Sequence, residues 1–270
     1  MQYSHLTCRG SAVRKWLSLS LVTIKKHFLL SIDVSLPSRQ QMEALLALPP
    51  QRRIELLLPF VNDNRVATLK AVLANRTRRV TVALENIFHS QNASAVVRSC
   101  ECFGIQDLTV VENTSPFLAS NGVARGASKW LTYHRFNERQ FNTPDAYVDL
   151  RNRGYTIVAA SPHPGHDVSL YDIDVAKGPV AVVFGAEKVG LSEWAMENAD
   201  LRMVIPMCGL TESLNISASA AITLSHLRRE VDTRLSPDQR MIPEEDRQEI
   251  FSHWLLASIR DAHDVLNRIL

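Results

Sequence analysis

Cysteine is scarce in this sequence, and no apolar run is long. The four cysteines among 270 residues have neither the paired spacing of a metal site nor the density of a disulfide framework, which favours a reducing cytoplasm. The best apolar run, WLSLSLVTI at 16–24, is stopped by Lys25 and Lys26, so a membrane-spanning helix is excluded. FGAEKVG at 184–190 lacks the spacing GxGxxG, which argues against a nicotinamide-binding site.

Acidic residues are few in the first part of the chain. Residues 1–79 contain thirteen Lys and Arg against four Asp and Glu, a net charge of +9, whereas the remainder contains seventeen against twenty-four, a net charge of −7. This asymmetry predicts a basic accessory segment that binds a polyanion, attached to a mildly acidic core. A solvated charged face is the alternative interpretation.

The basic part divides into two segments. Residues 1–35 resemble a signal or transit peptide without a clear cleavage site. We expect instead a basic leader outside the fold, with Met42 as a plausible older start. From 38 to 77, apolar residues recur at three- and four-residue spacing and prolines interrupt them, which predicts two or three short helices.

Five short β-rich runs follow, and helical patterns separate most of them. This alternation predicts an α/β fold with a parallel sheet, in which ligands collect at the loops that leave the carboxyl ends of the strands. The runs are VTVALEN (80–86), DLTVVE (107–112), YTIVAAS (155–161), PVAVVFG (179–185) and LRMVIP (201–206).

Unusual residues lie in two of the strand-end loops. After the first run come Asn92, at a helix cap position, and Arg98, six residues later in a predicted helix. The neighbours of Arg98 are small or apolar, so the arginine is costly there unless it has an anionic partner. After the fourth run, Gly185 allows close backbone approach and Glu187 follows.

A third loop, PMCGLTESLN, leads into a helix. Apolar residues recur at helical spacing from Ile216 to Leu227 and predict one buried stripe. Ser213, Asn215 and Ser217 can each cap the first turn, although one cap would suffice. This redundancy indicates that some of them face a ligand, and the three loops together predict a functional site.

Metal and nucleophile sites have weak support. His163 and His166 have the spacing of metal ligands, but histidines in a Pro-Gly loop are more often only exposed, so we expect no metal. Cys100 and Cys102 fall on opposite sides of a predicted helix and are expected to be packing thiols. No Ser-His-Asp or Cys-His arrangement can be argued.

Three segments, in order, resemble the motifs of the SpoU/TrmH branch of the SPOUT RNA 2′-O-methyltransferases, and most closely its tRNA guanosine methyltransferases. They are NASAVVR at 92–98, VVFGAEKVGLS at 182–192 and IPMCGLTESLNISASAA at 205–221. The resemblance covers about residues 60–260, and SKW at 128–130 and the FSHW-containing C-terminal helix belong to it.

The resemblance implies a parallel-sheet SPOUT domain at 80–233 with a deep C-terminal trefoil knot. A basic, helical, RNA-contacting segment at 36–79 would precede it, and a helical extension at 234–270 would follow. It also implies a homodimer and a pocket for S-adenosylmethionine, formed mostly by backbone groups. The residues implied near this cofactor are Phe184, Gly185, Glu187, Ile205, Leu214 and Asn215.

The resemblance also implies functional side chains. Arg98 would be catalytic, together with Asn92, Glu187, Ser213 and Asn215. Lys129, Arg151 and Arg229 would contact RNA phosphates, although Val231 stands where the family has a further basic residue.

The implied activity is transfer of a methyl group to a ribose 2′-hydroxyl of tRNA, at the D-loop guanosine. Ribosomal RNA is the alternative substrate. An RNA-binding protein without catalysis is a second alternative, against which the intact motif residues argue.

Overall fold

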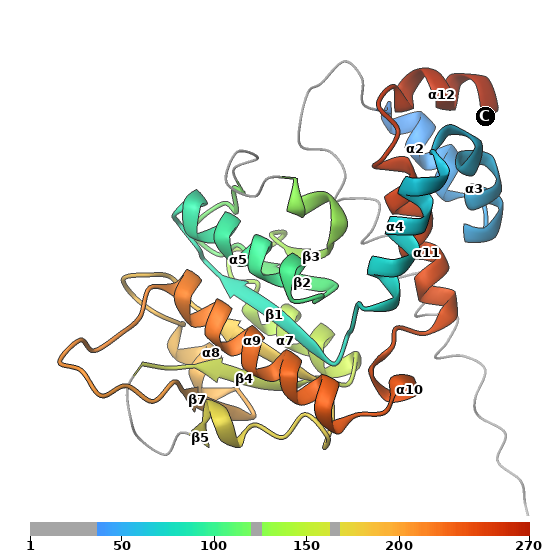
Figure 1. Cartoon of the computed structure of the whole chain (residues 1–270). Coiled ribbons are helices and arrows are strands. Elements are labelled where there is room, and N and C mark those ends of the chain that lie inside the picture. The colour runs from blue at the N-terminus through green and yellow to red at the C-terminus, as the bar shows by residue number, and fades with distance from the viewer. Residues whose placement is uncertain (1–36, 120–125, 163–167) are drawn as a thin grey trace, which may run out of the picture.

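The computed structural model describes residues 37–119, 126–162 and 168–270 (Figure 1). The expected leader at 1–35, Cys8 and the two loop histidines, His163 and His166, lie outside the described residues. None of the helices described is both long and apolar enough to cross a bilayer.

Seven parallel strands form one sheet in the order β3-β2-β1-β6-β4-β7-β5, which confirms the predicted α/β class. Every residue of β1, β2 and β6 is buried, because these central strands are covered on both faces. The strands are β1 (Val80–Glu85), β2 (Asp107–Val111), β3 (Thr132–Phe136), β4 (Thr156–Ala160), β5 (Val168–Ser169), β6 (Val180–Phe184) and β7 (Leu201–Val204).

The sequence pattern does not predict β3 and β5, the two edge strands. β3 reads TYHRF, and all five residues are half-buried, so it has neither a continuous apolar run nor a clean alternation. β5 contains only two residues. An edge strand pairs on one side only, which allows such short or mixed sequences.

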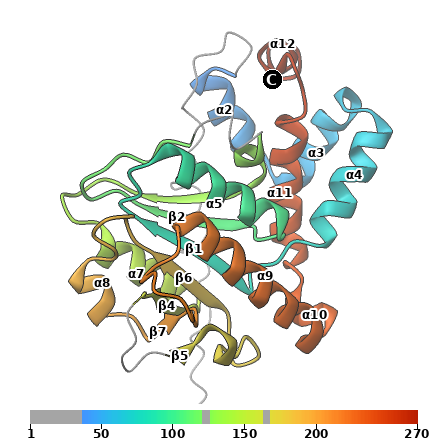
Figure 2. The same ribbon diagram turned by 60° about the vertical axis from the view of Figure 1, so that its left-hand side comes forward.

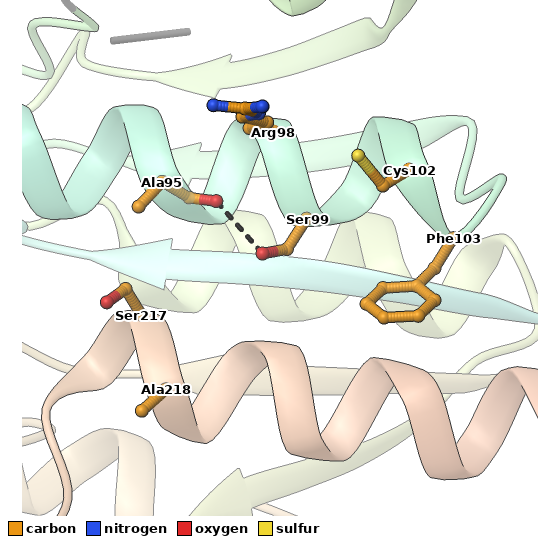
Figure 3. Close-up of a pocket in the computed structure, with 7 residues that line it drawn as sticks. All are labelled: Ala95, Arg98, Ser99, Cys102, Phe103, Ser217 and Ala218. Carbon is orange, nitrogen blue, oxygen red and sulfur yellow. Dashed lines mark hydrogen bonds between the residues drawn. The ribbon is translucent and has the colours of Figure 1, made fainter.

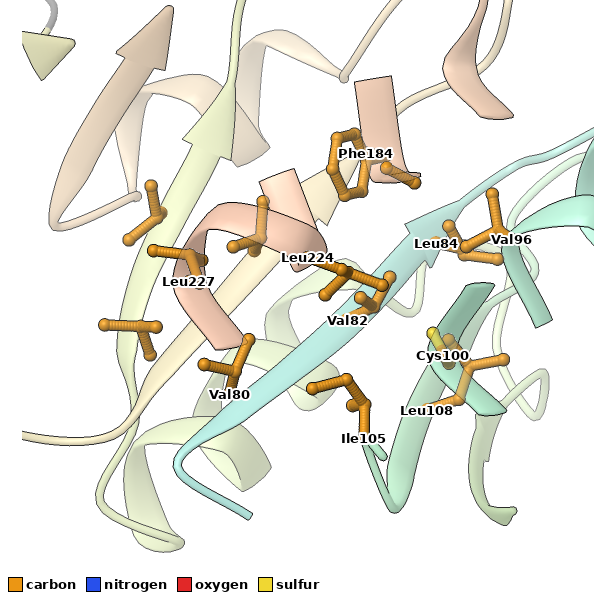
Figure 4. Packing of buried hydrophobic residues seen from close by; sticks show 14 of the residues in the cluster. Val80, Val82, Leu84, Val96, Cys100, Ile105, Leu108, Phe184, Leu224 and Leu227 are labelled. Atoms are coloured by element: carbon orange, nitrogen blue, oxygen red, sulfur yellow. The ribbon is translucent and has the colours of Figure 1, made fainter. Parts of the chain in front are cut away.

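Helices cover both faces of the sheet (Figures 1 and 2). α5 (Ser90–Cys102) and α9 (Ile216–Arg234) lie on one face, and α7 (Thr143–Asn152) and α8 (Glu193–Glu197) pack on the other. Figure 4 shows Val82 and Leu84 of β1 packed between side chains of α5 and α9. The predicted apolar stripe of α9 is buried in this core, although α9 follows β7 in the chain.

Helices from both ends of the described chain gather beside the sheet domain into a second core (Figures 1 and 2). The short helices predicted at 38–77 are confirmed as part of this bundle. The remaining helices are α2 (Arg39–Leu46), α3 (Pro50–Leu57), η1 (Leu58–Phe60), α4 (Asp63–Ala74), η2 (Ala127–Trp130), η3 (Leu170–Asp172), α10 (Pro237–Arg240), α11 (Glu244–Leu256) and α12 (Ala262–Ile269).

Trp130 and Trp254 join the bundle to the sheet domain. Their rings meet edge to face at 5.7 Å between centroids, and Trp254 Nε1 donates to Trp130 O at 3.0 Å. Inside the bundle, Arg53 is 4% exposed and forms a salt bridge with Glu249 of α11. The first and last helical segments are therefore parts of one packed unit.

A buried carboxylate organises the amino end of the sheet. Asp107 Oδ2 lies 3.0 Å from Arg78 Nε and 3.6 Å from Arg153 Nη1, and His134 lies beside it. Burial alone would raise the pKa of Asp107, but Arg78, His134 and Arg153 hold it well below its usual range. Arg78 also reaches Asp246 of α11 at 2.8 Å, so this cluster ties the helical bundle to the strands.

The basic residues of 37–79 do not all face solvent, which narrows the predicted polyanion-binding role. Four of the eight Lys and Arg residues there have partners within the fold: Arg53, Arg76, Arg78 and Arg79. Arg39 and Arg52 pair with glutamates of their own helices. Arg65 and Lys70 have no carboxylate partner among the described residues.

Candidate active site

The three motif loops meet at the carboxyl ends of β1, β6 and β7. Asn215 Nδ2 donates to Asn92 Oδ1 at 3.3 Å, and Asn92 Nδ2 donates to Glu187 Oε1 at 2.7 Å. One chain of hydrogen bonds therefore joins side chains that are 123 and 95 residues apart in sequence. The convergence expected from parallel-sheet topology is present in the structure.

Asn92 is not a helix cap, contrary to the prediction. α5 begins at Ser90 after the N-cap residue His89, whose side chain forms no capping bond. Asn92 lies within the first turn, and both ends of its amide point to other loops. The local pattern suggested a cap because Asn favours caps, but the tertiary contacts of this side chain take precedence.

Glu187 lies in a loop that folds back on itself. Ala186 and Gly190 exchange backbone hydrogen bonds of 3.0 and 2.8 Å, and a Cβ on Gly185 would lie 2.2 Å from Gly190 C. Only glycine fits there, so the predicted close approach involves the loop's own backbone. Partial burial opposes ionisation of Glu187, but the bond from Asn92 and the nearby His89 hold its pKa below the ordinary value.

Asn215 is the N-cap of α9, as its sequence position allows. Its Oδ1 accepts from the backbone N–H of Ser217 at 2.9 Å and also from the Ser217 hydroxyl. Its Nδ2 remains available for Asn92. Ser213 is exposed two residues before the cap, and no hydrogen bond of its side chain is found in the part of the chain that the structure describes.

Arg98 stands on the outer face of α5, where it is exposed. The small and apolar neighbours of Arg98 in the sequence predicted that its charge would be costly without an anionic partner. This prediction is wrong, because the side chain is exposed and water reaches the guanidinium. It forms no salt bridge or hydrogen bond within 37–119, 126–162 or 168–270. Arg98 lines a pocket of about 450 Å³ between α5 and α9. Figure 3 shows the side chains that line this pocket, namely Arg98, Ala95, Ser99, Cys102, Phe103, Ser217 and Ala218.

The two α5 cysteines differ from the expected pair of packing thiols. Cys100 is buried, and burial raises the pKa of its thiol to about 12. Cys102 is exposed and lines the cavity beside Arg98. Only Cys100 is a packing residue.

The residues expected around the cofactor offer the kinds of group that a nucleoside binds. The side chain of Phe184 is 3% exposed and belongs to the core, so only its backbone and that of Gly185 can face a ligand. Ile205 packs partly against the same core, whereas Leu214 is 39% exposed. Backbone groups of 206–214 have no backbone hydrogen-bond partners among the described residues. Unpaired amides beside apolar side chains suit adenine and amino-acid groups.

The three basic residues expected to contact RNA lie in different environments. Arg229 is exposed on α9. Arg151 is engaged with Asp200 at 2.9 Å. Lys129 Nζ lies 4.6 Å from the Trp130 ring centroid. Burial and the nearby Arg65 lower the pKa of Lys129. Arg65 is a cation that sequence reasoning did not single out, and it lies 4.9 Å from the same ring.

Glu85 is a further residue that the sequence did not single out. It ends β1 within an apolar run, and its carboxylate is buried beside the Glu187 loop. A charged residue at the last position of a central strand was the available signal. No group of three possible metal ligands occurs among the described residues.

A parallel sheet with polar loops converging at its carboxyl edge defines an α/β ligand-binding domain. The model of the SpoU rRNA methylase family matches residues 79–225, and the chain belongs to this family. A tRNA (guanosine(18)-2′-O)-methyltransferase of Borreliella burgdorferi is 36% identical over 176 residues, which cover 65% of this chain and 78% of the relative. The protein of the same name from Thermus thermophilus is 34% identical over 194 residues, which cover 72% and 96%.

Solved structures agree with this assignment. The crystal structure of the TrmH/SpoU tRNA modifying enzyme from Aquifex aeolicus matches with a TM-score of 0.64 at 28% identity, covering 73% of this chain and 98% of that one. An AdoMet-bound rRNA methyltransferase from Sinorhizobium meliloti shares the fold, with a TM-score of 0.50 at 23% identity over 60% of this chain and 59% of the other.

Proposed function

We propose that this protein transfers a methyl group from S-adenosylmethionine to the ribose 2′-hydroxyl of a guanosine in the D-loop of tRNA, in the cytoplasm. The observation that carries the proposal is the hydrogen-bond chain Asn215–Asn92–Glu187, which joins the three motif loops close to the arginine of the first motif. The names of the relatives at 36% and 34% identity support tRNA guanosine as the substrate.

The cofactor, when bound, supplies an electrophilic methyl group on a sulfonium. Backbone groups of Phe184, Gly185 and Ile205, with Leu214 and Asn215, would hold it; Ile205 and Asn215 adjoin the stretch 206–214, whose backbone has no backbone hydrogen-bond partner among the described residues. Glu187 and Asn92 keep the loops in register through their direct bond. The chain's contribution is therefore alignment of the reacting groups, which accounts for a large part of many rate enhancements.

Arg98 acts by electrostatics in this proposal. A guanidinium stays protonated in proteins, so Arg98 is not the base that removes the hydroxyl proton. Exposed beside the α5–α9 cavity and without an acidic partner among the described residues, it can bind the adjacent RNA phosphate and stabilise the forming alkoxide. A phosphate oxygen or water then accepts the proton.

We further propose that the active protein is a homodimer and that the chain is knotted at the site. Support for a partner comes from large apolar side chains that stand exposed on the motif loops: Phe88 at 69%, Val189 at 82% and Leu210 at 104%. In this proposal a second copy of the chain covers these side chains, which removes their apolar surface from water. Support for a knot comes from α9, which follows β7 yet packs against α5 and β1.

The test is methyl transfer from labelled S-adenosylmethionine to an unmodified tRNA transcript and, in parallel, to naked ribosomal RNA. We expect label in tRNA, recovered after nuclease digestion as 2′-O-methylguanosine from the D-loop. Clear preference for ribosomal RNA would favour the alternative substrate. Label on a base, or no transfer to either RNA, would overturn the proposed function.

A further inference from the structure

Glu85 is a buried carboxylate that has no cationic partner among the described residues. It is 1% exposed at the carboxyl end of β1, and no salt bridge to it exists within the described part of the chain. Burial of a carboxylate is costly unless hydrogen-bond donors compensate for the lost water. This contrasts with Asp107, the other buried acid of the sheet, which has arginines on two sides.

Three donors surround Glu85. Ser192 donates its backbone N–H to Oε2 and its hydroxyl to Oε1, each at 2.8 Å, and the Thr143 hydroxyl donates to Oε1 over a short distance. Each hydroxyl also accepts a bond elsewhere, from Ala195 N at 3.2 Å and from Asn113 Nδ2 at 2.9 Å. Their protons are therefore directed at Glu85, which acts only as an acceptor.

Glu85 thereby connects both ends of the loop that carries Glu187. The loop begins after Phe184, whose strand pairs with β1 so that Leu84 is the partner of Phe184. It ends at Ser192, which Glu85 binds through both backbone and side chain. The Thr143 bond adds the first turn of α7 to the same point.

We propose that Glu85 is a positioning residue for methyl transfer, whose buried carboxylate fixes the loop at 185–191 for cofactor binding. This inference rests on the proposed function. Bonds from Asn92 and from the backbone of His89 hold Glu187 near the start of the loop, and Leu191 packs against the core near its end. The bonds between Ser192 and Glu85 fix the end of the loop, so their removal lets the loop shift away from the cofactor. Glu85 itself touches no reacting group.

The test compares Glu85→Gln and Thr143→Val with the control Thr81→Val in the full-length protein. Thr81 lies on the same strand, is fully buried and donates to Asp107 O at 2.7 Å, so its replacement removes a comparable bond far from the loop. In Glu85→Gln the side chain presents an amide N–H₂ to donors in either orientation, so at least one bond is broken.

The readouts are the Kd for S-adenosylmethionine by calorimetry, the KM for cofactor and tRNA, and thermal stability. We expect Glu85→Gln to raise the cofactor Kd and KM about tenfold, the effect of one charged hydrogen bond, and Thr143→Val to raise them about threefold. The KM for tRNA stays within about twofold in both variants. Thr81→Val should lower Tm without changing the cofactor KM, because partial unfolding reduces kcat only.

Equal cofactor affinity in Glu85→Gln and wild type would overturn the role of Glu85. If Glu85→Gln does not fold, the comparison of Thr143→Val with Thr81→Val tests the proposal. Equal cofactor KM values in these two variants, at an equal loss of Tm, would overturn the role of Glu85. A wild-type protein that binds no S-adenosylmethionine would instead overturn the proposed function, so the two failures are distinguishable.

Discussion

The two ends of the parallel sheet both collect polar side chains, but they use them in different ways. At the amino end, Asp107 is 3% exposed and Arg78 and Arg153 neutralise it. At the carboxyl ends of β1 and β6, the amide of Asn215 bonds to Asn92 and that of Asn92 to Glu187, hydroxyl and N–H donors bond to Glu85, and Arg98 is exposed without an acidic partner among the described residues. The charged groups of the first cluster therefore pair with one another, whereas the second cluster keeps groups that can bind a ligand.

This difference separates stability from function in one domain. The charges at the amino end pair with one another and fasten the helical bundle to the strands. At the carboxyl end, the backbone of 206–214 and the guanidinium of Arg98 lack protein partners in the described chain. Unused donors at strand ends are what a cofactor and a phosphate require. Substitutions at the amino end should therefore lower stability with little effect on cofactor binding. Substitutions at the carboxyl end should lower activity with little effect on stability.

The largest effect on activity is expected for Arg98→Ala. Loss of the guanidinium should lower kcat by about 10²–10³-fold, as for other groups that stabilise a developing oxyanion. Cofactor affinity and Tm should change little, because Arg98 has no partner within the described residues. Arg98→Lys keeps the charge but not the planar fork, and near-normal kcat in that variant would contradict a geometric role.

Asp107→Asn is the opposite case. It should lower the free energy of unfolding by about 1.5–3 kcal/mol, because Arg78 and Arg153 lose a charged partner but keep Asp246 and Asp149. The cofactor KM of the folded protein should not change. The pKa of Asp107 is depressed in the folded state, so its contribution is present above the unfolded pKa and is lost as pH falls through the folded pKa. Denaturant titration at pH 7 measures the change in the free energy of unfolding. A weaker cofactor affinity in folded Asp107→Asn would contradict the division of roles between the two ends of the sheet.

The bond between Asn92 and Glu187 should couple the two loops in binding. Asn92→Ala and Glu187→Ala should each weaken cofactor affinity, and the double variant should fall short of the summed effects by about 1 kcal/mol. Asn92→Ala combined with Thr81→Val provides an uncoupled control. Strict additivity of the Asn92 and Glu187 effects would show that the bond between them does not contribute to cofactor binding.

A smaller effect is expected on the salt dependence of tRNA binding, for cations of the basic segment that have no carboxylate partner among the described residues. Arg65→Ala with Lys70→Ala should reduce the salt dependence of tRNA binding by about 2 in slope, one for each RNA phosphate that the protein no longer neutralises. Arg39→Ala with Arg52→Ala is the matched control, because those arginines are paired in their own helices. Equal slopes for the two double variants, measured by filter binding, would contradict this division.

The central strands and the site loops could be predicted from the sequence because their signals are local. The apolar runs of β1 and β6 reflect burial on both faces, and the polar loops follow from parallel topology. β3 and β5 were not predictable, because edge strands need little apolar pattern. The contacts of Asn92 and Glu85 depend on residues about 100 positions away, which no local pattern encodes.

The charge count was informative only in part, for a similar reason. The excess of +9 in residues 1–79 is a property of composition, and a count does not show which cations are buried. Arg53 and Arg76 are 4% and 2% exposed and pair with acids of the core and bundle. Tertiary structure, rather than composition, determines which positive charges remain for a polyanion.

The most direct test of the central claim is a map of ribose methylation in RNA from cells that lack the gene. We expect the loss of one 2′-O-methyl group, on the D-loop guanosine of tRNA. Wild-type protein should restore it, whereas Arg98→Ala should not and Asp107→Asn should do so in proportion to its folded amount. An unchanged tRNA methylation profile, or a missing methyl group in ribosomal RNA instead, would contradict the proposed function.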